Sequence, residues 1–435
     1  MPSGNHNYTL SRRTFLAVCG SCVGVGSLGG YAYGSDLVLD TDCTVTPLDT
    51  SPADWPLPDY DGANTRTVSY ENAPKRGLAK QWSLSTKHPG QPIVRNGSVF
   101  LTPGGNSPDY IASYDLFSGE QEWAKPISIS GYQPTLMAGG DSLFVGEVSE
   151  NERWVSKAVA TADGSEQWVS DVDSDTITPV FEAGLLVFQT SSRSGGALTA
   201  IDARTGNECW QKSFEDSPRL STTHAGETIV LETNLNGAIT ALDAETGEQQ
   251  WKVDISEYFH PNEDKINDSV RGRLIAGTDR IFFRTFGGIL IALNASTGEI
   301  DWVTPETPPE LPTEGGRYYI PPGLEPVAFT EDVLVCVESD ATDRSDTLHA
   351  INPTTGSEQW AYRPEKQEGV DIRSAAVAGE TVFFLVNTEL RLVDLSNGDL
   401  LERHGFDGYG ESVTLADSVC LVTTTEELVA FEEAR

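Results

Sequence analysis

Short apolar runs separated by tight turns recur along most of the chain. Residues 91–100, 178–188 and 375–384 each contain two such runs joined by turn residues that include glycine. Runs of this length, rich in β-branched and aromatic residues and bounded by turn signals, are typical of β-hairpins. The pattern therefore predicts an all-β chain.

One motif follows these hairpins repeatedly. It consists of a small residue, an apolar residue, Asp or Asn, two residues, Thr or Ser, Gly, three residues and Trp. We expect each copy to form a strand, a tight turn and a strand, with glycine at positive φ and the Asp and Thr side chains bonding turn amides. Clear copies occupy residues 113–123, 200–210, 241–251, 292–302 and 350–360, and degraded copies end at Trp168 and at Glu402, where tryptophan is expected.

The repeats recur every 41 to 58 residues, and four strands in each repeat of this length match the period of a propeller blade. Trp82 lies in an outermost strand with no inner strands before it, and residues 412–431 supply three strands that lack an outer one. We therefore predict an eight-bladed β-propeller of four-stranded antiparallel blades, closed by N- and C-terminal strands in one composite blade. The repeat tryptophans should pack between blades: Trp82, Trp123, Trp168, Trp210, Trp251, Trp302 and Trp360.

These repeats, over residues 79–431, resemble the pyrroloquinoline-quinone (PQQ) repeat superfamily. With the leader at residues 55–66, WPLPDYDGANTR, they are similar to its BamB-like branch. The resemblance implies two functions, a non-enzymatic assembly scaffold or a calcium- and PQQ-dependent dehydrogenase. Such dehydrogenases hold the quinone against a vicinal disulfide and a tryptophan floor, with calcium near a catalytic Asp. This chain has no adjacent cysteines, so we expect a protein-binding scaffold without cofactor, metal or catalytic residue. A quinoprotein oxidoreductase is the alternative.

The N-terminus resembles a twin-arginine export signal followed by a glycine-rich apolar stretch, with a small-x-small cleavage site at residues 32–34. We expect an extracellular or cell-surface protein, and an uncleaved signal would be its only membrane contact. The motif residues are Arg12, Arg13, Phe15 and Leu16. The expected division is residues 1–34 as signal peptide, 35–70 as linker or leader and 71–435 as propeller.

The charge balance narrows the range of partners. The chain has 65 Asp and Glu against 29 Lys and Arg, a net charge of −36, which argues against binding nucleic acid or an anionic membrane. Only 9 of the basic residues are Lys. Such a composition resembles that of halophilic archaeal proteins, in which molar salt screens an acidic surface; an acidic mesophilic protein is the alternative. We expect a monomer.

Two further residue patterns are assigned structural roles. Cys209, Cys336 and Cys420 lie in apparent strands, where a buried cysteine acts as a small apolar residue. Asp171, Asp173, Asp175 and Glu182 have the spacing of a calcium loop, but threonine occupies the glycine position, so we expect no metal site there.

The longest insertions predict a binding face. The tryptophan spacing is 51 and 58 residues in the two units that end at Trp302 and Trp360, against 41 to 45 elsewhere. Both insertions should fall on the face opposite the Thr-Gly turns, and they carry aromatic and arginine residues, which favour protein recognition. The alternative is that these residues only cap the channel or pack the loops down. A carbohydrate-binding or hydrolytic propeller is a third possible function, suggested by the aromatic residues. The candidates are Tyr258, Phe259, His260, Arg271, Arg317, Tyr318 and Tyr319.

Overall fold

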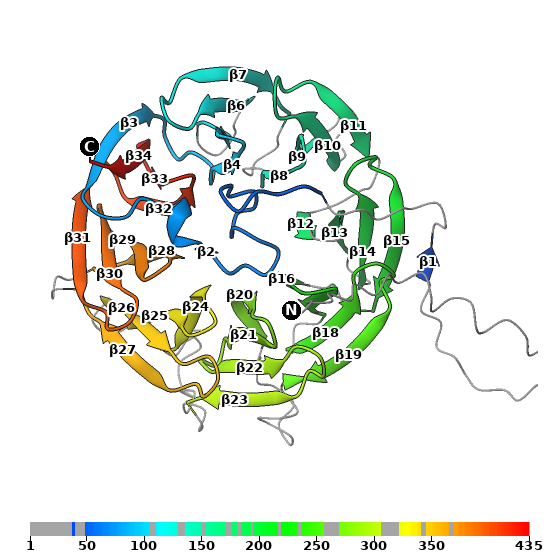
Figure 1. Ribbon diagram of the computed structural model, residues 1–435. Coiled ribbons are helices and arrows are strands. Elements are labelled where there is room, and N and C mark those ends of the chain that lie inside the picture. The colour runs from blue at the N-terminus through cyan, green and yellow to red at the C-terminus, as the bar shows by residue number, and fades with distance from the viewer. Residues whose placement is uncertain are drawn as a thin grey trace, which may run out of the picture. The chain divides into compact units, whose positions relative to one another are not determined.

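A computed structural model describes one compact unit of the chain within Asp36–Arg435. The residues that it describes are 37–39, 48–104, 110–128, 135–148, 154–170, 176–180, 184–192, 195–215, 219–233, 237–255, 269–305, 322–340, 345–364 and 369–434. In these ranges eight antiparallel sheets of four strands are arranged in a ring (Figure 1). The predicted eight-bladed propeller is confirmed.

Each of the first four blades is built from consecutive strands, from the channel outward. Blade I is β4 (Ile93–Arg95), β5 (Ser98–Leu101), β6 (Tyr110–Asp115) and β7 (Gln121–Pro126). Blade II is β8 (Met137–Gly139), β9 (Ser142–Val148), β10 (Trp154–Ala160) and β11 (Glu166–Ser170). Blade III is β12 (Thr176–Val180), β13 (Leu185–Ser192), β14 (Gly195–Asp202) and β15 (Glu208–Phe214). Blade IV is β16 (Arg219–Ala225), β17 (Thr228–Glu232), β18 (Ala238–Asp243) and β19 (Gln249–Asp254).

The next three blades follow the same plan. Blade V is β20 (Val270–Ala276), β21 (Arg280–Thr285), β22 (Leu290–Asn294) and β23 (Ile300–Thr304). Blade VI is β24 (Leu324–Phe329), β25 (Leu334–Asp340), β26 (Ser345–Ile351) and β27 (Glu358–Tyr362). Blade VII is β28 (Ile372–Ala378), β29 (Thr381–Val386), β30 (Glu389–Asp394) and β31 (Leu400–Gly405).

Blade VIII closes the ring. Its inner strands are β32 (Gly410–Ala416), β33 (Val419–Thr424) and β34 (Glu427–Glu433), and its outer strand is β3 (Leu78–Ser85) from the other end of the chain. The strands β3 and β34 are antiparallel, with Trp82 opposite Ala430. The composite blade predicted from the sequence is confirmed, and it removes the open sheet edges that an unclosed array would expose.

Two short strands extend the sheets. The strand β2 (Thr67–Val68) pairs in parallel with the inner edge of β28, and β1 (Leu37–Leu39) pairs with the outer strand β15. A 3₁₀ helix, η2 (Tyr70–Asn72), follows β2. Within the described residues no helix is long and apolar enough to cross a membrane.

The second strand of a blade is apolar on both faces because a neighbouring blade covers each of them. β29 has the sequence TVFFLV and β17 has TIVLE, and every residue of both strands is buried. The outer strands are more exposed, as in β7, where no residue is fully buried. This gradient explains why continuous apolar runs, rather than strict alternation, mark the blades in the sequence.

The repeat tryptophans tie each blade to the next one. Each indole N–H donates to a backbone carbonyl in the outer turn of the following blade, as Trp210 does to Ala244 at 3.0 Å. The turn glycine has positive φ, and its missing Cβ leaves room for the ring: a Cβ on Gly247 would lie 2.8 Å from Trp210. The same hydrogen bond is made by Trp82, Trp123, Trp168, Trp251, Trp302 and Trp360.

The turns themselves have the predicted hydrogen bonds. In blade IV the Asp243 carboxylate accepts from the Thr246 amide at 2.9 Å, and the Thr246 hydroxyl accepts from the Glu248 amide at 3.2 Å. Asn294 and Asn352 take the place of aspartate in blades V and VI and accept from the Thr297 and Thr355 amides. The predicted roles of glycine, Asp or Asn and Thr are confirmed.

The junction between blades VII and VIII differs, because there Glu402 replaces the tryptophan. The Glu402 carboxylate accepts hydrogen bonds from the Gly77 amide at 2.6 Å and the Leu78 amide at 3.3 Å, at the start of β3. Blade VIII has no turn between its two outer strands, since β34 and β3 come from opposite ends of the chain. At this seam the two blades are therefore joined by a carboxylate that accepts hydrogen bonds from backbone amides, whereas at the other junctions a tryptophan packs on a turn glycine.

The cysteines follow expectation in part. Cys336 and Cys420 are free thiols and fully buried, as expected. Cys209 is also buried, but it is disulfide-bonded rather than a simple apolar residue. Its partner lies outside the described residues, since Cys336 and Cys420 are free. A strand pattern predicts burial of a cysteine but not its pairing. Residues 171–175 and 181–183 of the calcium-like spacing also lie outside the described residues.

Candidate binding site

The segment before blade I, residues 48–72, lies inside the ring and contacts the inner edges of the blades (Figure 1, blue). Trp55 pairs with Val94 on β4 through two backbone hydrogen bonds of 2.9 and 3.0 Å. Further along, the same segment makes backbone hydrogen bonds to the inner strands of blades II, V, VI and VII. Its carbonyls at Pro56, Ala63, Thr65 and Arg66 accept from the amides of Ala138, Ala276, Phe329 and Val377. We call residues 48–72 the leader segment.

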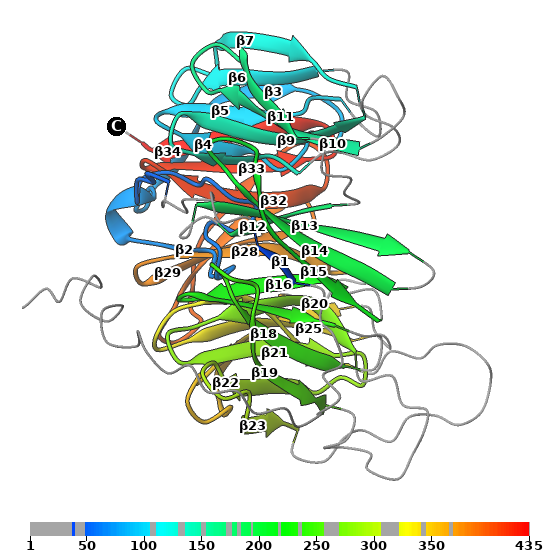
Figure 2. The same cartoon turned by 90° about the vertical axis from the view of Figure 1, so that its right-hand side faces the viewer.

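The leader segment is anchored by apolar burial and by an ion pair. Trp55 and Leu57 are almost fully buried. Trp55 belongs to an apolar cluster with residues of blades I and VIII, and Leu57 to one with residues of blades II and III. The Asp54 carboxylate lies 2.5 Å from Arg95 and accepts from the Asn96 amide at 2.8 Å. The leader segment contacts the inner strands at or near their C-terminal ends, which lie on the same face of the ring as the outer turns. It therefore lies across that end of the channel (Figure 2).

Arg66 is the last anchor and the base of the site. Its guanidinium donates to the carbonyls of Ala375 at 2.6 Å and Val413 at 2.7 Å, and to the Ser374 hydroxyl at 2.7 Å. It also donates to Asp59 at 2.8 Å and lies over the Trp55 ring at 5.4 Å. A side chain this buried, 3% exposed, needs such full satisfaction of its donors.

Asp59 lies between two guanidinium groups. It accepts from Arg66 and from Arg273 of β20. Burial acts to raise the pKa of Asp59, but the charges of Arg273 and Arg66 and their hydrogen bonds outweigh it, so the pKa lies below its ordinary value. The carboxylate is therefore ionised, and one negative charge is shared by two positive ones.

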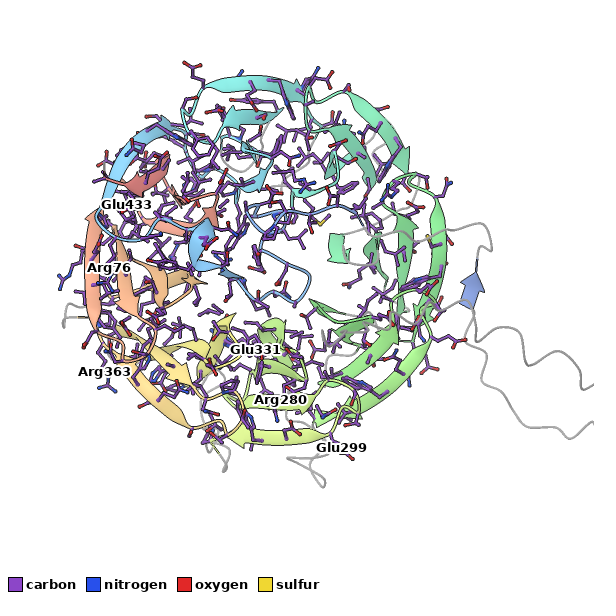
Figure 3. All side chains as sticks on the ribbon, viewed as in Figure 1. Arg76, Arg280, Glu299, Glu331, Arg363 and Glu433 are labelled. Atoms are coloured by element: carbon purple, nitrogen blue, oxygen red, sulfur yellow. The ribbon has the colours of Figure 1, made fainter. Side chains whose placement is uncertain are left out.

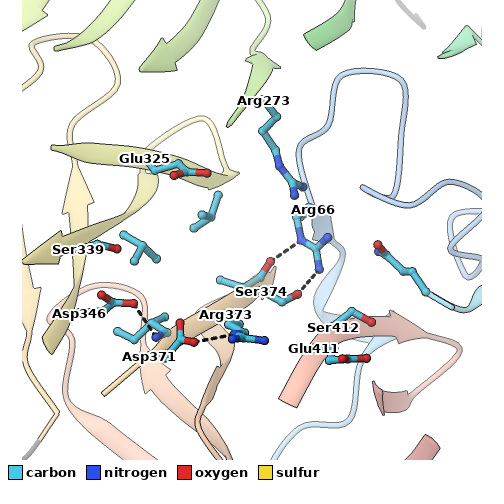
Figure 4. A pocket seen from close by; sticks show the side chains of 15 residues that line it. Arg66, Arg273, Glu325, Ser339, Asp346, Asp371, Arg373, Ser374, Glu411 and Ser412 are labelled. Carbon is cyan, nitrogen blue, oxygen red and sulfur yellow. Dashed lines mark hydrogen bonds and ion pairs between the residues drawn. The ribbon is translucent and has the colours of Figure 1, made fainter. Parts of the chain in front are cut away.

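Next to this base lies a cavity of about 350 Å³, whose lining side chains are drawn in Figure 4. Because most of them come from the starts of inner strands, the cavity lies toward the face opposite the outer turns. Its walls come from the starts of the inner strands β20, β24, β28 and β32 and from β25 and β26. The lining consists of Arg66, Gln91, Arg273, Glu325, Val327, Val337, Ser339, Asp346, Asp371, Ile372, Arg373, Ser374, Ala375, Glu411 and Ser412.

The wall from blades VI to VIII carries carboxylates. Asp346 accepts a hydrogen bond from the Ile372 amide at 2.8 Å. Burial raises the pKa of Asp346, and the negative charge of nearby Asp371 raises it further. The hydrogen bonds from Ile372 and Ser339 act in the opposite direction but do not outweigh burial. Asp371 pairs with Arg373 at 2.7 Å, and Glu411 lies 3.1 Å from His88. These groups face the cavity from three different blades.

Blade V contributes Arg273 to the cavity lining. Two more arginines lie near it on the same blade, where Arg271 and Arg284 are opposite each other in the register of β20 and β21. Burial lowers the pKa of Arg284 to about 10, and the like charge of Arg271 adds to this effect, although Glu325 and Glu338 oppose it. Three arginines are therefore gathered on blade V in a protein with a net charge of −36.

Of the seven residues predicted for the binding face, Arg271 is described, and it lies on β20 beside the cavity wall. The other six, Tyr258, Phe259, His260, Arg317, Tyr318 and Tyr319, lie outside the described residues. No sequence pattern singled out Asp59, Arg66, Arg273 or Asp346. The leader motif contains Asp59 and Arg66, but their partners on the blades are more than 200 residues away, so no local spacing links them to those blades.

The described lining does not match the quinone site that the resemblance implies. It contains no tryptophan and no cysteine. The repeat tryptophans are in the outer strands, and Trp55 is buried within the leader segment. Among the described residues no group of three or more His, Cys, Asp or Glu side chains could hold a metal ion.

Comparisons with known proteins agree on the fold. The propeller is similar to BamB from Moraxella catarrhalis (14% identity, TM-score 0.53, 82% of this chain and 97% of that one). It is also similar to the quinohemoprotein alcohol dehydrogenase from Comamonas testosteroni (14%, 0.62, 88% and 81%) and to a europium-containing methanol dehydrogenase (14%, 0.63, 88% and 99%). At such low identity these likenesses show the fold alone.

Sequence comparison is more specific. No curated protein sequence matches the chain significantly. A family model described as outer membrane protein assembly factor BamB matches residues 151–317 and again 235–435. Together the two matches cover more than half of the chain, so the protein belongs to this BamB-like family of PQQ-repeat propellers.

Proposed function

We propose that this protein is an exported, non-catalytic propeller that binds a partner protein at the cell exterior through the face around the cavity. The observation that carries the proposal is the make-up of that face. Its walls are strands held by the leader segment, and the described part of its lining carries both acidic and basic side chains but no tryptophan or cysteine. The family description, an outer membrane assembly factor, supports a binding role.

Export and adaptation to salt are part of the proposal. The twin-arginine-like motif at Arg12 and Arg13 supports export, and the charge of −36 with few lysines supports a surface adapted to high salt. Exposed aromatic residues support partner binding: Tyr409, 59% exposed, lies two residues before Glu411 of the cavity lining.

The test is crosslinking on intact cells followed by mass spectrometry. A Tyr409→Ser, Arg271→Ser double variant should lose the main crosslinked partner, and a second variant with Tyr258, Tyr318 and Tyr319 changed to Ser should do the same. The matched control is Phe117→Ser, because Phe117 is 50% exposed but lies in an outer turn on the opposite face. If both test variants keep the wild-type partners, this face is not the binding surface.

The alternative, a quinoprotein oxidoreductase, is supported by the shared fold of the alcohol and methanol dehydrogenases. Incubation of the purified protein with PQQ and calcium, followed by gel filtration, separates the two functions. A quinone absorbance that travels with the protein would replace the scaffold proposal, whereas complete loss of the quinone is the expected result.

A further inference from the structure

The base of the cavity carries an excess of positive charge. Arg66 and Arg273 share the single carboxylate of Asp59, which leaves one excess positive charge there. Arg66 cannot serve a ligand, because its donors are used by Ala375, Val413, Ser374, Pro58 and Asp59. Arg273 can, since its side chain is 40% exposed and its contact with Asp59 uses Nη1, which leaves Nε and Nη2 for a ligand.

The opposite wall has the opposite charge. Asp346, Asp371 and Glu411 project from blades VI, VII and VIII, and Figure 4 shows Asp346 and Asp371 across the cavity from Arg273. Asp371 is 47% exposed and Arg373 engages one of its two oxygens. Asp346 is held in place by the Ile372 amide. These oxygens can therefore accept hydrogen bonds from a cationic group.

The two walls together exclude most ligand classes. A pure anion on Arg273 would share the cavity with the four carboxylates of Glu325, Asp346, Asp371 and Glu411, against one further cation, Arg373. A pure cation would lie next to the excess positive charge of the base. Either arrangement leaves a charge in the cavity poorly paired. A ligand with both charges matches both walls. A volume of about 350 Å³ is at the small end of ligand pockets, which favours a molecule of roughly 10 to 20 heavy atoms.

We propose that this cavity binds a small zwitterion, an amino acid or a short peptide, with its carboxylate on Arg273 and its ammonium group on Asp346 and Asp371. The proposal goes beyond partner binding and does not depend on it. The residues that it uses differ from those changed in the crosslinking test, so the two can fail separately.

The experiment is isothermal titration with three matched probes. Triglycine carries both charges, N-acetyltriglycine only the carboxylate and triglycinamide only the ammonium group. At pH 7 and constant KCl, triglycine should bind at least about tenfold more tightly than either blocked form. Equal affinity for the three probes, or no binding of triglycine at millimolar concentration, would overturn the proposal.

Variants assign the two ends of the ligand. Arg273→Gln should remove the preference for triglycine over triglycinamide, and Asp346→Asn should remove the preference over N-acetyltriglycine. Lys252→Gln, on the exposed outer strand β19, is the matched control and should change neither. Thermal melts verify folding. Arg273→Lys keeps the positive charge and should keep the preference for triglycine over triglycinamide. Wild-type selectivity in Asp346→Asn, or in a folded Arg273→Gln, would contradict the assignment.

Discussion

At the scale of single residues, the contact between tryptophan and glycine is the unit that joins one blade to the next. Glycine serves two purposes in it. It adopts a left-handed backbone, with φ of +70° at Gly247, and it leaves the ring of Trp210 room to lie on its Cα. A side chain at this position would strain the backbone and displace the ring, whereas at an open turn glycine such as Gly226 it would strain the backbone alone.

Two glycines of blade IV separate these effects. Gly226 also has positive φ, +64°, but a Cβ there would meet no atom within 4 Å. Gly226→Ala should cost about 1–2 kcal/mol from the left-handed backbone. Gly247→Ala should cost that and a further ~1–3 kcal/mol, because its Cβ would displace the Trp210 ring. Chemical denaturation in constant high salt measures the free energy of unfolding of both variants. Equal losses in Gly226→Ala and Gly247→Ala would mean that the contact with the Trp210 ring adds nothing to stability.

At the scale of elements, the leader segment acts as a part of the propeller core. It satisfies backbone groups of six blades, I, II and V to VIII, and buries Trp55 and Leu57 between itself and the blades. Its attachment near blades VII and VIII depends on Arg66, which spans Asp59 in the leader segment and carbonyls on β28 and β32.

Removing Arg66 should therefore be costly. Arg66→Met leaves Asp59 buried with one partner instead of two and leaves the Ala375 and Val413 carbonyls unbonded, so we expect a loss of about 3–5 kcal/mol in the free energy of unfolding. Arg373→Met is the control: its side chain is 51% exposed, and its pair with Asp371 should be worth less than about 1 kcal/mol.

The same pair gives a dependence on pH. The pKa of Asp59 is lower in the folded protein than the ordinary value of 3.8, so its contribution to stability is present above the pKa of the unfolded chain and is lost as the pH falls through the folded pKa. In Arg66→Met the lowering is weaker, and the unfolding free energy should fall less steeply with pH below about 4. Identical slopes for wild type and variant would show that Asp59 does not titrate as argued.

At the scale of the whole molecule, closure depends on one seam without a tryptophan. Although burial acts to raise the pKa of Glu402, the amide of Gly77, the side chain of His404 and the amide of Leu78 together hold that pKa below its usual value. The ionised carboxylate thus fixes the start of β3 to blade VII, while β3 itself pairs with β34.

We predict that Glu402→Gln loosens this seam. A neutral amide oxygen is a weaker acceptor than a carboxylate, so the amides of Leu78–Ser85 should exchange hydrogen faster with solvent. Glu402→Trp should also loosen the seam, because an indole has no acceptor for the amides of Gly77 and Leu78. Glu433→Gln, an exposed residue at the end of β34, is the control for both. Unchanged exchange of β3 in Glu402→Gln would assign closure to the β3–β34 pairing alone.

The net charge also acts on the whole molecule. Charged side chains project from the rim of the ring, among them Glu299 and Arg363 (Figure 3). An excess of 36 negative charges repels itself, and salt screens that repulsion, with a Debye length of about 10 Å at 0.1 M and about 3 Å at 1 M. We expect the melting temperature to rise strongly between about 0.1 M and 3 M KCl, and folding to fail at the low end. A cooperative melt that is unchanged over this range would contradict the salt-adapted assignment.

The sequence by itself determined the blades, their number and their closure. It did so because the determinants are local: glycine at the turn, Asp or Asn three residues before Thr and tryptophan at a fixed distance all act within one repeat, and the repeat supplies many copies. Even the exception at Glu402 was visible as a missing tryptophan, although its capping role at Gly77 was not.

The tertiary structure alone decided where the leader segment lies and what the cavity contains. Arg66 bonds residues 309 and 347 positions away, and Asn64 bonds a carbonyl 210 positions away. No periodicity encodes such contacts. The cavity takes its charges from four blades and the leader segment, and none of these residues forms a motif in its own neighbourhood. Ring closure brings them together, and so the dipolar site became visible only in the folded molecule.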